Sequence, residues 1–448
     1  MNTVFVVTLA LACSIGGPTA RAADGDLDPS FSRDGKKTTD FAKSADLARA
    51  VALQADGKIV VAGTTYQNND YSHEDFAVAR YTASGQLDAT FGAKGRVTTD
   101  FPGLAAEPSA IAVQPDGKIV VAGGAFPLFV FAGNFALARY NSDGSLDAGF
   151  GNGGIVTTSF GHGSYAFSLA LQPDGKILAA GTEFVDFSSD DSSNTDFALA
   201  RYHPDGTLDA TFGIGGRVTT DFDGFDDDAF SVLVQPDGKI VAVGSAKNPT
   251  NFYDFALVRY HPNGTLDTRF GAAGKVRTDA GGHNFDRARA AALQPDGKIV
   301  AAGFGSSPFG TQRFAVARYA PSGALDPTFS RDGKAQIDFG SCCEYANSVL
   351  VQGDGKIVVV GIADTESSDS DFLLARLTPK GALDSSFGSG GKVRTSFGDL
   401  NGGAFGAALQ PDGKIVAVGF QATNSDQWAE FALARYLASG AGAQAASR

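Results

Sequence analysis

The residues of this chain best suited to binding a metal ion are a run of aspartates between residues 221 and 228. The run reads Asp-Phe-Asp-Gly-Phe-Asp-Asp-Asp. Carboxylate oxygens are hard ligands that suit Ca²⁺, so Asp223, Asp226 and Asp228 are the candidate ligands. The run lacks the third alternating aspartate and the distal glutamate of a calcium-binding loop. We therefore favour a solvated acidic loop over a calcium site, and Ca²⁺ is the one cofactor we consider.

Side chains suited to catalysis are few and scattered. Among the five histidines, His162 and His283 lie in irregular segments, and no two histidines have the spacing of metal ligands. The sequence contains no Gly-x-Ser-x-Gly elbow, no His-Glu-x-x-His and no phosphate loop. We expect binding rather than catalysis. A lyase or hydrolase site near His162 and His283, assembled from distant parts of the chain, is the alternative.

Several side chains that occur only once are candidates for binding a partner. An apolar run at residues 125–131 is either packed against the fold or exposed as a sticky patch, and the one tryptophan could anchor a partner. An adjacent cysteine pair, Cys342 and Cys343, forms either a strained disulfide or two thiols. The candidate binding residues are Trp428, Phe126, Phe129, Phe131, Asp190, Asp191, Asp227 and Asp228.

An internal repeat must position all these residues. The segment Gln-x-Asp-Gly-Lys occurs seven times, at intervals of 58 to 63 residues. Each copy joins two runs rich in β-branched residues through a turn, which predicts a β-hairpin. The copies begin at Gln54, Gln114, Gln172, Gln235, Gln294, Gln352 and Gln410.

Each repeat contains two further strands. Phe-Ala-Leu-Ala-Arg-Tyr or a close variant follows each hairpin, and a Leu-Asp-x-x-Phe segment then leads to a short strand such as residues 154–158. Four short antiparallel strands in a unit of ~60 residues are typical of a propeller blade. The sequence therefore predicts an all-β, seven-bladed β-propeller of four-stranded antiparallel blades.

The ends of the chain predict how the ring closes. The first Leu-Asp-x-x-Phe segment (Leu27, Asp28, Phe31) precedes every hairpin, and none follows Tyr436. The last blade thus lacks its fourth strand, and the start of the chain has a spare one. We expect the N-terminal strand to complete the last blade, which removes the open edges of the sheet.

Repetition also separates structural from functional candidates. A residue present in every blade is needed for folding, whereas a residue present once is free to act. An arginine ends each third strand and an aspartate follows each Leu, so we expect structural Arg–Asp pairs. The arginines are Arg80, Arg139, Arg201, Arg259, Arg318, Arg376 and Arg435, and the aspartates are Asp28, Asp88, Asp147, Asp209, Asp267, Asp326 and Asp384.

The order of strands places all irregular segments on one face. In a four-stranded meander, the loop between strands two and three lies on the same side as the crossing to the next blade. The Asp-Gly-Lys turns and Leu-Asp-x-x-Phe connections lie on the other side. We name these the variable face and the turn face. The variable face is acidic, and functional residues usually lie on such loops.

Composition and the start of the chain indicate an exported protein. Residues 1–22 resemble a signal peptide, with a short apolar run and Ala20-Arg21-Ala22 as the cleavage site. We expect the propeller at residues 23–436, a disordered tail at 437–448, and a monomer that is secreted, periplasmic or on the cell surface. The net charge of −13 argues against nucleic acid as a partner, and we expect no membrane span.

The repeat resembles a known family. Gln-Pro-Asp-Gly-Lys-Ile-Val-Val-Ala-Gly, Phe-Ala-Leu-Ala-Arg-Tyr and Gly-x-Leu-Asp-x-x-Phe-Gly resemble the bacterial delta-60 repeat, a presumed β-propeller. The resemblance implies a propeller and export but no chemistry. We expect a binding module that acts through its variable face on a protein, glycan or cationic partner. A propeller enzyme and a calcium-stabilised structural protein are the alternatives.

Overall fold

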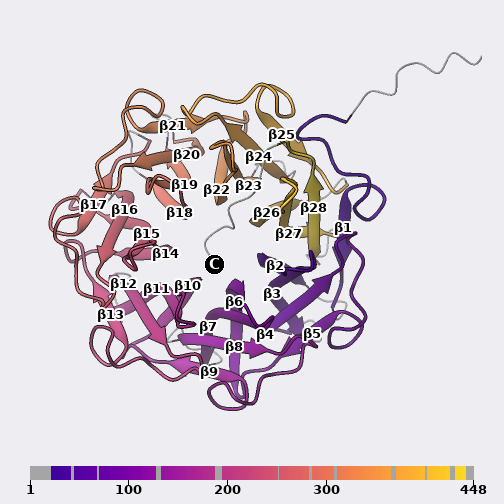
Figure 1. Ribbon diagram of the computed structural model, residues 1–448, viewed down its shortest axis with the longest axis horizontal. Helices are drawn as coiled ribbons and strands as arrows, with labels where there is room; N and C mark the ends of the chain where they lie inside the picture. The colour runs from indigo at the N-terminus through magenta and orange to yellow at the C-terminus, as the bar shows by residue number, and fades with distance from the viewer. Residues whose placement is uncertain are drawn as a thin grey trace, which may run out of the picture.

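The computed structural model forms a closed ring of β-sheets around a central axis (Figure 1). It describes residues 22–41, 45–67, 70–127, 133–186, 194–250, 252–281, 285–306, 310–364, 370–398, 401–423 and 429–439. These ranges contain strands β1 to β28, and no helix in them is long and apolar enough to cross a membrane. The predicted seven-bladed propeller of four-stranded blades is confirmed.

Each blade is an antiparallel meander whose first strand lies nearest the axis (Figure 1). The first, inner strands are β2 (Asp46–Leu53), β6 (Leu104–Val113), β10 (Ser164–Leu171), β14 (Asp227–Val234), β18 (Arg287–Leu293), β22 (Cys343–Val351) and β26 (Gly402–Leu409). The second strands are β3 (Ile59–Gln67), β7 (Ile119–Pro127), β11 (Ile177–Asp186), β15 (Ile240–Lys247), β19 (Ile299–Ser306), β23 (Ile357–Asp364) and β27 (Ile415–Ala422).

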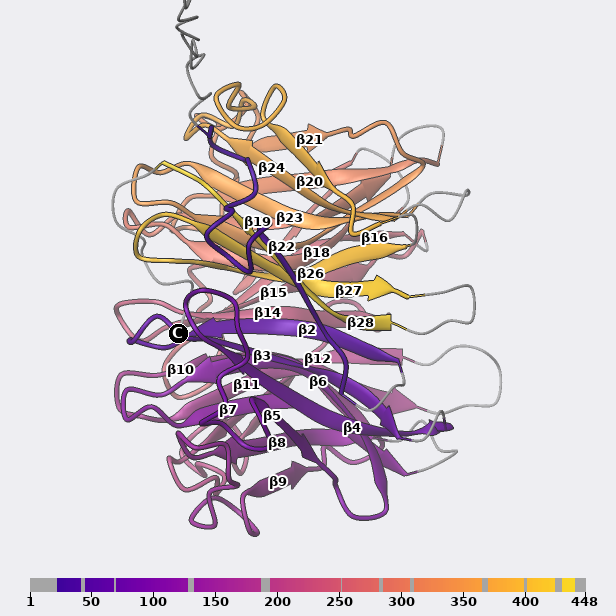
Figure 2. The ribbon, with the colours of Figure 1, turned by 90° about the vertical axis from the view of Figure 1, so that its right-hand side faces the viewer.

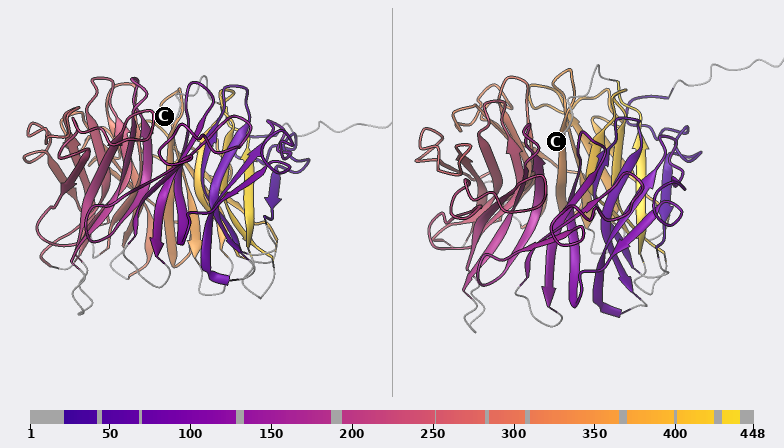
Figure 3. Two further views of the ribbon diagram at one scale, coloured as in Figure 1. Left: turned by 90° about the horizontal axis from the view of Figure 1, so that it is seen from below. Right: turned by 60° about the horizontal axis from the view of Figure 1, so that its bottom comes forward.

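The third and fourth strands form the outer half of each blade. The third strands are β4 (Asp70–Tyr81), β8 (Asn134–Tyr140), β12 (Asn194–Tyr202), β16 (Tyr253–Tyr260), β20 (Gln312–Tyr319), β24 (Asp371–Leu377) and β28 (Ala429–Tyr436). The fourth are β5 (Arg96–Thr99), β9 (Ile155–Thr158), β13 (Arg217–Thr220), β17 (Lys275–Thr278), β21 (Lys334–Ile337), β25 (Lys392–Thr395) and β1 (Lys36–Thr39). Blades 1 to 7 are numbered in this order, and Figures 2 and 3 show their strands running between the two faces.

The N-terminal strand closes the ring as the sequence predicts. Strand β1 pairs antiparallel with β28, from Lys36 opposite Ala434 to Thr39 opposite Phe431. The fourth strand of blade 7 therefore comes from the start of the chain. Blades 5 and 6 have one further link, a single parallel pair between Gln312 and Cys343.

Apolar side chains fill the wedge between neighbouring blades, and a buried tyrosine ties most junctions. Tyr81 at the end of β4 donates its hydroxyl proton to Thr39 of blade 7, with 2.8 Å between the oxygens. Leu377 replaces this tyrosine in blade 6, and Ile337 replaces the threonine opposite it. Both are buried in the same apolar cluster. The two departures compensate each other, because neither side of this junction brings a hydroxyl that would need a partner.

The repeated arginines and aspartates form ion pairs near the turn face. Nε of Arg318 lies 2.9 Å from Oδ2 of Asp326, and its Nη1 donates to the carbonyl of Pro379 in the next blade at 2.6 Å. The guanidinium covers the ring of Phe329, and Lys298 approaches the same carboxylate at 3.4 Å. All seven blades contain this Arg–Asp pair, at 2.8 to 2.9 Å. Each arginine therefore ties its own strand to the Leu-Asp turn that follows it.

The first prediction concerns closure. Deleting residues 22–41 should lower the free energy of unfolding by several kcal/mol, because β28 becomes an open edge and the buried Phe31 and Asp28 are lost. Denaturant unfolding of the deletion variant beside the full chain measures the loss. Equal midpoints for the two proteins would contradict the closure.

The second prediction concerns the ion pairs. Arg201→Ala should cost about 3–5 kcal/mol of stability, because it leaves Asp209 buried without its guanidinium. Arg269→Ala, on an exposed turn nearby, should change stability by no more than about 0.5 kcal/mol. Thermal and chemical unfolding of both variants test the difference. An equal loss of stability in the two variants would contradict a specific structural role for the Arg201–Asp209 ion pair.

Candidate functional site

Every inner strand carries a β-bulge at the same place, about halfway along its length. In β14 the register shifts between Ala229 and Ser231, so Phe230 is the extra residue. A bulge adds one residue to a strand and turns its side chain away from the regular alternation. The seven extra residues are Arg49, Ser109, Phe167, Phe230, Arg289, Asn347 and Phe405.

The repeated glycine of the second strand permits this bulge. A Cβ on Gly244 would lie 1.8 Å from the carbonyl oxygen of Asp228, and a Cβ on Gly181 would lie 1.9 Å from that of Tyr165. No side chain tolerates such a contact, so only glycine fits opposite the bulge. The Val-Ala-Gly motif of the repeat is therefore required by the geometry of the inner strand.

Two positions of the inner strand differ in chemistry from blade to blade. They are the bulged residue and the residue two places before it, and small buried residues such as Ala229 lie between them. All but Gly403 are partly exposed. We call these fourteen residues the axial ring: Leu47, Arg49, Glu107, Ser109, Tyr165, Phe167, Asp228, Phe230, Arg287, Arg289, Tyr345, Asn347, Gly403 and Phe405.

On blades 2 to 4, the ring consists of aromatic and hydroxyl groups in contact with one another, together with the carboxyl groups of Glu107 and Asp228. The Tyr165 hydroxyl lies 3.1 Å from Ser109 Oγ and 3.3 Å from Glu107 Oε2. The ring of Phe167 lies with its centroid 4.7 Å from that of Tyr165 and 4.9 Å from that of Phe230. These contacts cross from one blade to the next, so the side chains form one continuous surface.

On blades 5 to 7 and blade 1, the ring consists of guanidinium groups and their neighbours. Arg289 Nη1 donates to Asn347 Oδ1 at 2.8 Å, and its guanidinium lies 5.1 Å from the ring centroid of Tyr345. Arg287 covers the ring of Tyr253 at 3.9 Å. Arg49 covers the ring of Phe405 at 4.6 Å. Each guanidinium thus lies within cation–π distance of an aromatic ring.

These arginines carry positive charge that the protein does not neutralise by contact. Among the described residues, no carboxylate lies within ion-pair distance of Arg49, Arg287 or Arg289, in contrast to the seven repeated arginines. Burial, with repulsion from Arg287 and Arg49, lowers the pKa of Arg289 to about 10. The group remains charged at neutral pH. The charges of Arg287 and Arg49 act on the nearby carboxyls of Asp228 and Glu74, where they oppose the rise in pKa that burial causes.

A pair of glutamates lies beside Arg49. Burial and the nearby charge of Glu107 raise the pKa of Glu74 to about 7, while Tyr66 and Arg49 act to lower it. One carboxyl of this pair therefore holds a proton near neutral pH. A protonated acid next to a carboxylate and a tyrosine can donate and accept protons.

The aspartates considered as calcium ligands do not converge. Asp223 Oδ2 lies 2.8 Å from Arg277 Nη1. Asp226 Oδ2 accepts from the Tyr253 hydroxyl at 2.8 Å and lies 3.2 Å from Lys247 Nζ. The structure therefore does not bring these carboxylates together. Asp228, the third candidate, accepts a hydrogen bond of 2.6 Å from the Thr182 hydroxyl.

Asp227 was expected in a solvated loop, but it is fully buried. Its Oδ2 accepts from the backbone N–H of Phe222 at 2.6 Å, which caps the crossing loop. Burial first, then repulsion from Asp221 and Asp196, raises the pKa of Asp227 to about 8. Equivalent acids in blades 1, 5 and 6 (Asp46, Asp286 and Glu344) accept loop N–H groups in the same way. The expectation of a surface charge is therefore wrong for Asp227.

The other candidates are scattered or not described. Phe126 is partly buried near the end of β7, opposite Ala105. His162 is exposed on a crossing loop, and Cys342 and Cys343 are partly buried at the start of β22. Trp428, Phe129, Phe131, Asp190, Asp191 and His283 lie outside the described residues.

The axial ring was missed because it forms no motif in any single repeat. Its signal appears only when the seven inner strands are aligned on the small residues that flank the bulge. From blade 1 to blade 7, the position two places before the bulge then reads Leu, Glu, Tyr, Asp, Arg, Tyr and Gly. The bulged position reads Arg, Ser, Phe, Phe, Arg, Asn and Phe. Apart from these two positions and the capping position that precedes them, the residues of the inner strands are small or apolar.

The buried capping acids predict how stability depends on pH. Burial raises the pKa of Asp46 and of Asp286 to about 7, so the native state holds protons that the unfolded state releases above its pKa near 4. Stability should therefore rise as the pH falls from about 8 to about 5. Across this range, the melting temperature should depend less on pH in the Asp46→Asn and Asp286→Asn variants than in the wild type. The exposed Asp100→Asn variant should keep the wild-type pH dependence. A wild-type melting temperature that fell over this range would contradict these shifts.

Comparison with solved structures finds other propellers. A catalytically inactive variant of virginiamycin B lyase from Staphylococcus aureus has 10% identity and a TM-score of 0.46, covering 90% of this chain and 99% of its own. The polysaccharide lyase Uly1 has 11% identity and a TM-score of 0.48, covering 94% and 98%. Drosophila Plexin A in complex with Semaphorin 1b has 10% identity and a TM-score of 0.45, covering 93% and 87%. Likeness at this level carries no argument about function.

A comparison with curated proteins finds no match. A family of propeller repeats, however, matches seven segments that together cover more than half of the chain. These segments are residues 54–91, 114–150, 172–212, 235–270, 294–329, 352–387 and 410–441. Each begins at a Gln-x-Asp-Gly-Lys hairpin, so the match confirms the predicted repeat, although the delta-60 name is not part of the description. The chain belongs to the family described as "Domain of unknown function (DUF5122) beta-propeller".

Proposed function

We propose that this chain is an exported binding protein whose axial ring binds acidic oligosaccharides. One observation carries the proposal: the guanidinium groups of Arg49, Arg287 and Arg289 lie on inner strands, near enough to repel one another, and make no ion pair with a carboxylate among the described residues. A protein with a net charge of −13 has many acids available for pairing. Unpaired arginines in such a chain favour an anionic ligand, because guanidinium binds carboxylate in a bidentate geometry.

The rest of the ring supports a sugar rather than a small inorganic anion. Phe167 and Phe230 offer flat apolar surfaces against which the C–H faces of a pyranose ring could pack. Tyr165, Ser109 and Glu107 offer hydroxyl and carboxylate groups for sugar hydroxyls. An oligosaccharide built from uronic acids combines the anionic, apolar and hydroxyl groups that these side chains complement.

The charges of the variable face argue against the cationic partner that composition favoured. Asp227 is buried, and Asp223 and Asp226 are already paired with Arg277 and Lys247. Less of the acidic charge is therefore available than the sequence indicates. The axial ring instead combines unpaired positive charge with aromatic surface.

A second candidate function is a polysaccharide lyase or hydrolase at the same ring. The observation that favours it is the glutamate pair, in which Glu74 has a pKa raised to about 7 by burial and by Glu107. A group with this pKa is suited to general acid–base catalysis at neutral pH. Tyr165 and Arg49 interact with the same pair: the charge of Glu107 helps to raise the pKa of Tyr165, and Arg49 acts to lower the pKa of Glu74.

The fourth prediction tests binding. Isothermal titration of the full chain with oligogalacturonate and alginate fragments should show binding that weakens with salt, while neutral malto- and cello-oligosaccharides should not bind. Arg289→Ala should weaken binding about 10-fold or more, since a hydrogen bond to a charged group contributes about 1.5–3 kcal/mol. Arg269→Ala, exposed and outside the ring, should bind like the wild type.

Two controls separate the outcomes. A melt of Arg289→Ala that matches the wild type shows that lost binding is not lost folding. Release of shortened or unsaturated sugars from the acidic oligomers, abolished in Glu74→Gln, would replace the binding proposal by the enzymatic one. Equal affinity of wild type and a folded Arg289→Ala, or no affinity for any acidic oligomer, would overturn the role of the ring.

A further inference from the structure

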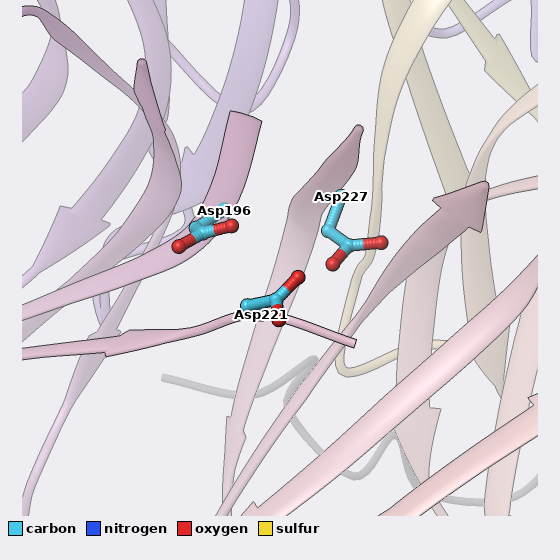
Figure 4. Close-up of side chains that lie close together, drawn as sticks. All are labelled: Asp196, Asp221 and Asp227. Atoms are coloured by element: carbon cyan, nitrogen blue, oxygen red, sulfur yellow. The ribbon is translucent and has the colours of Figure 1, made fainter. Parts of the chain in front are cut away.

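Three positions recur where one blade crosses to the next, and at some junctions all three are acidic. The first precedes the phenylalanine of the third strand, the second follows the fourth strand, and the third is the capping position of the next inner strand. Between blades 3 and 4 these positions are Asp196, Asp221 and Asp227. One carboxylate oxygen from each lies within 4.8 Å of those of the other two. Figure 4 shows their carboxyl groups converging from β12, the loop after β13 and the start of β14.

Each of these carboxylates keeps an oxygen that the protein does not use. Asp227 is fully buried, and its Oδ1 has no hydrogen-bond partner although its Oδ2 accepts from Phe222. Oδ1 of Asp196 is buried and also without a partner. Asp221 accepts from the Gly224 N–H through its Oδ1 alone. A buried carboxylate oxygen without a partner is costly, and a bound cation would satisfy it.

No side chain supplies the missing positive charge by contact. Lys275 Nζ donates to the backbone carbonyl of Asp221 at 2.5 Å rather than to its carboxylate. Arg277 pairs with Asp223, outside the group, at 2.8 Å. Within the described residues, the three carboxylates therefore make no ion pair with lysine or arginine, despite two cations nearby.

At two other junctions, the acids at these positions are satisfied by hydrogen bonds or by an ion pair. Between blades 4 and 5, Asp286 accepts backbone N–H groups on both oxygens, from Gly281 at 2.7 Å and Ser306 at 3.0 Å, and Asp254 accepts from Asn248. Between blades 5 and 6 the first position is an arginine, Arg313, which pairs with Asp338 at 2.9 Å.

The remaining acidic junction differs in spacing. Between blades 7 and 1 the positions are Glu430, Asp40 and Asp46. Within the described residues, only the group at blades 3 and 4 brings three such oxygens within 4.8 Å of one another. The arrangement there is thus particular to one junction and is not a property of the repeat.

We infer that Asp196, Asp221 and Asp227 bind a hard divalent cation of the Ca²⁺ or Mg²⁺ kind. Ca²⁺ bonds to oxygen at about 2.3–2.6 Å. One ion can therefore contact three oxygens that lie within 4.8 Å of one another, with water completing its coordination shell. The ion would link blade 3 to blade 4 beside Asp228 of the axial ring. It is a different site from Asp223, Asp226 and Asp228, and the inference does not depend on the proposed function.

The fifth prediction tests this site with the full chain, stripped of metal by a chelator and then titrated with CaCl₂ or MgCl₂. Wild type should bind one ion per chain, and a saturating concentration should raise its melting temperature by about 2 °C or more. Asp221→Asn, at an exposed position, and Asp196→Asn should each weaken binding about 10-fold or more. Asp254→Asn, at the matching position of the next junction, should bind like the wild type.

The outcomes are separable. Preference for Mg²⁺ over Ca²⁺ with the same pattern of variants would support the site and identify the smaller ion. No binding to wild type at about 10 mM of either ion would overturn the inference, as would equal affinities for wild type and a folded Asp221→Asn. Loss of binding in Asp254→Asn to the same degree would place the ion elsewhere and also overturn it. Should Asp196→Asn fail to fold, Asp221→Asn carries the test.

Discussion

The fold depends on a close contact inside each blade, between the bulged inner strand and the glycine of the second strand. The backbone of each inner strand presses on the second strand of its blade, where a Cβ on Gly244 would lie 1.8 Å from a carbonyl oxygen. Glycine at this position and alanine beside the bulge follow from that crowding. The bulge in turn releases one side chain per blade from the regular packing. The close contact that fixes glycine and alanine in every blade therefore also places the bulged residue, whose type can vary from blade to blade.

Charge is distributed in two distinct ways on the two faces. Near the turn face, each repeated arginine meets an aspartate, and hydrogen bonds from Thr90 and the guanidinium of Arg80 overcome burial to lower the pKa of Asp88 to about 2. Toward the variable face, Arg289 has no such partner in the described part of the chain, and Asp227 has an unpartnered oxygen. Neutralised pairs hold a structure together. Charges left without partners point to ligands from outside.

The sequence predicts the fold well because each element has a local signal that is repeated. The Gln-x-Asp-Gly-Lys turn marks the hairpin, and the spare Leu27, Asp28 and Phe31 segment indicates how β1 closes the ring. The site was less accessible. Phe230 and Arg289 look like ordinary strand residues until the bulge places them together. Asp227 reads as a solvated acid, since sequence does not tell whether a carboxylate caps a backbone N–H.

The central proposal is that a ligand binds to the axial ring. The most direct measurement is hydrogen exchange of the full chain with and without an acidic oligosaccharide, followed by mass spectrometry. We predict slower exchange in peptides that contain the first halves of β2, β18 and β22, which hold Arg49, Arg289 and Asn347. Peptides from the Asp-Gly-Lys turns should be unchanged. Protection confined to the turn face, with none in the inner strands, would contradict the account.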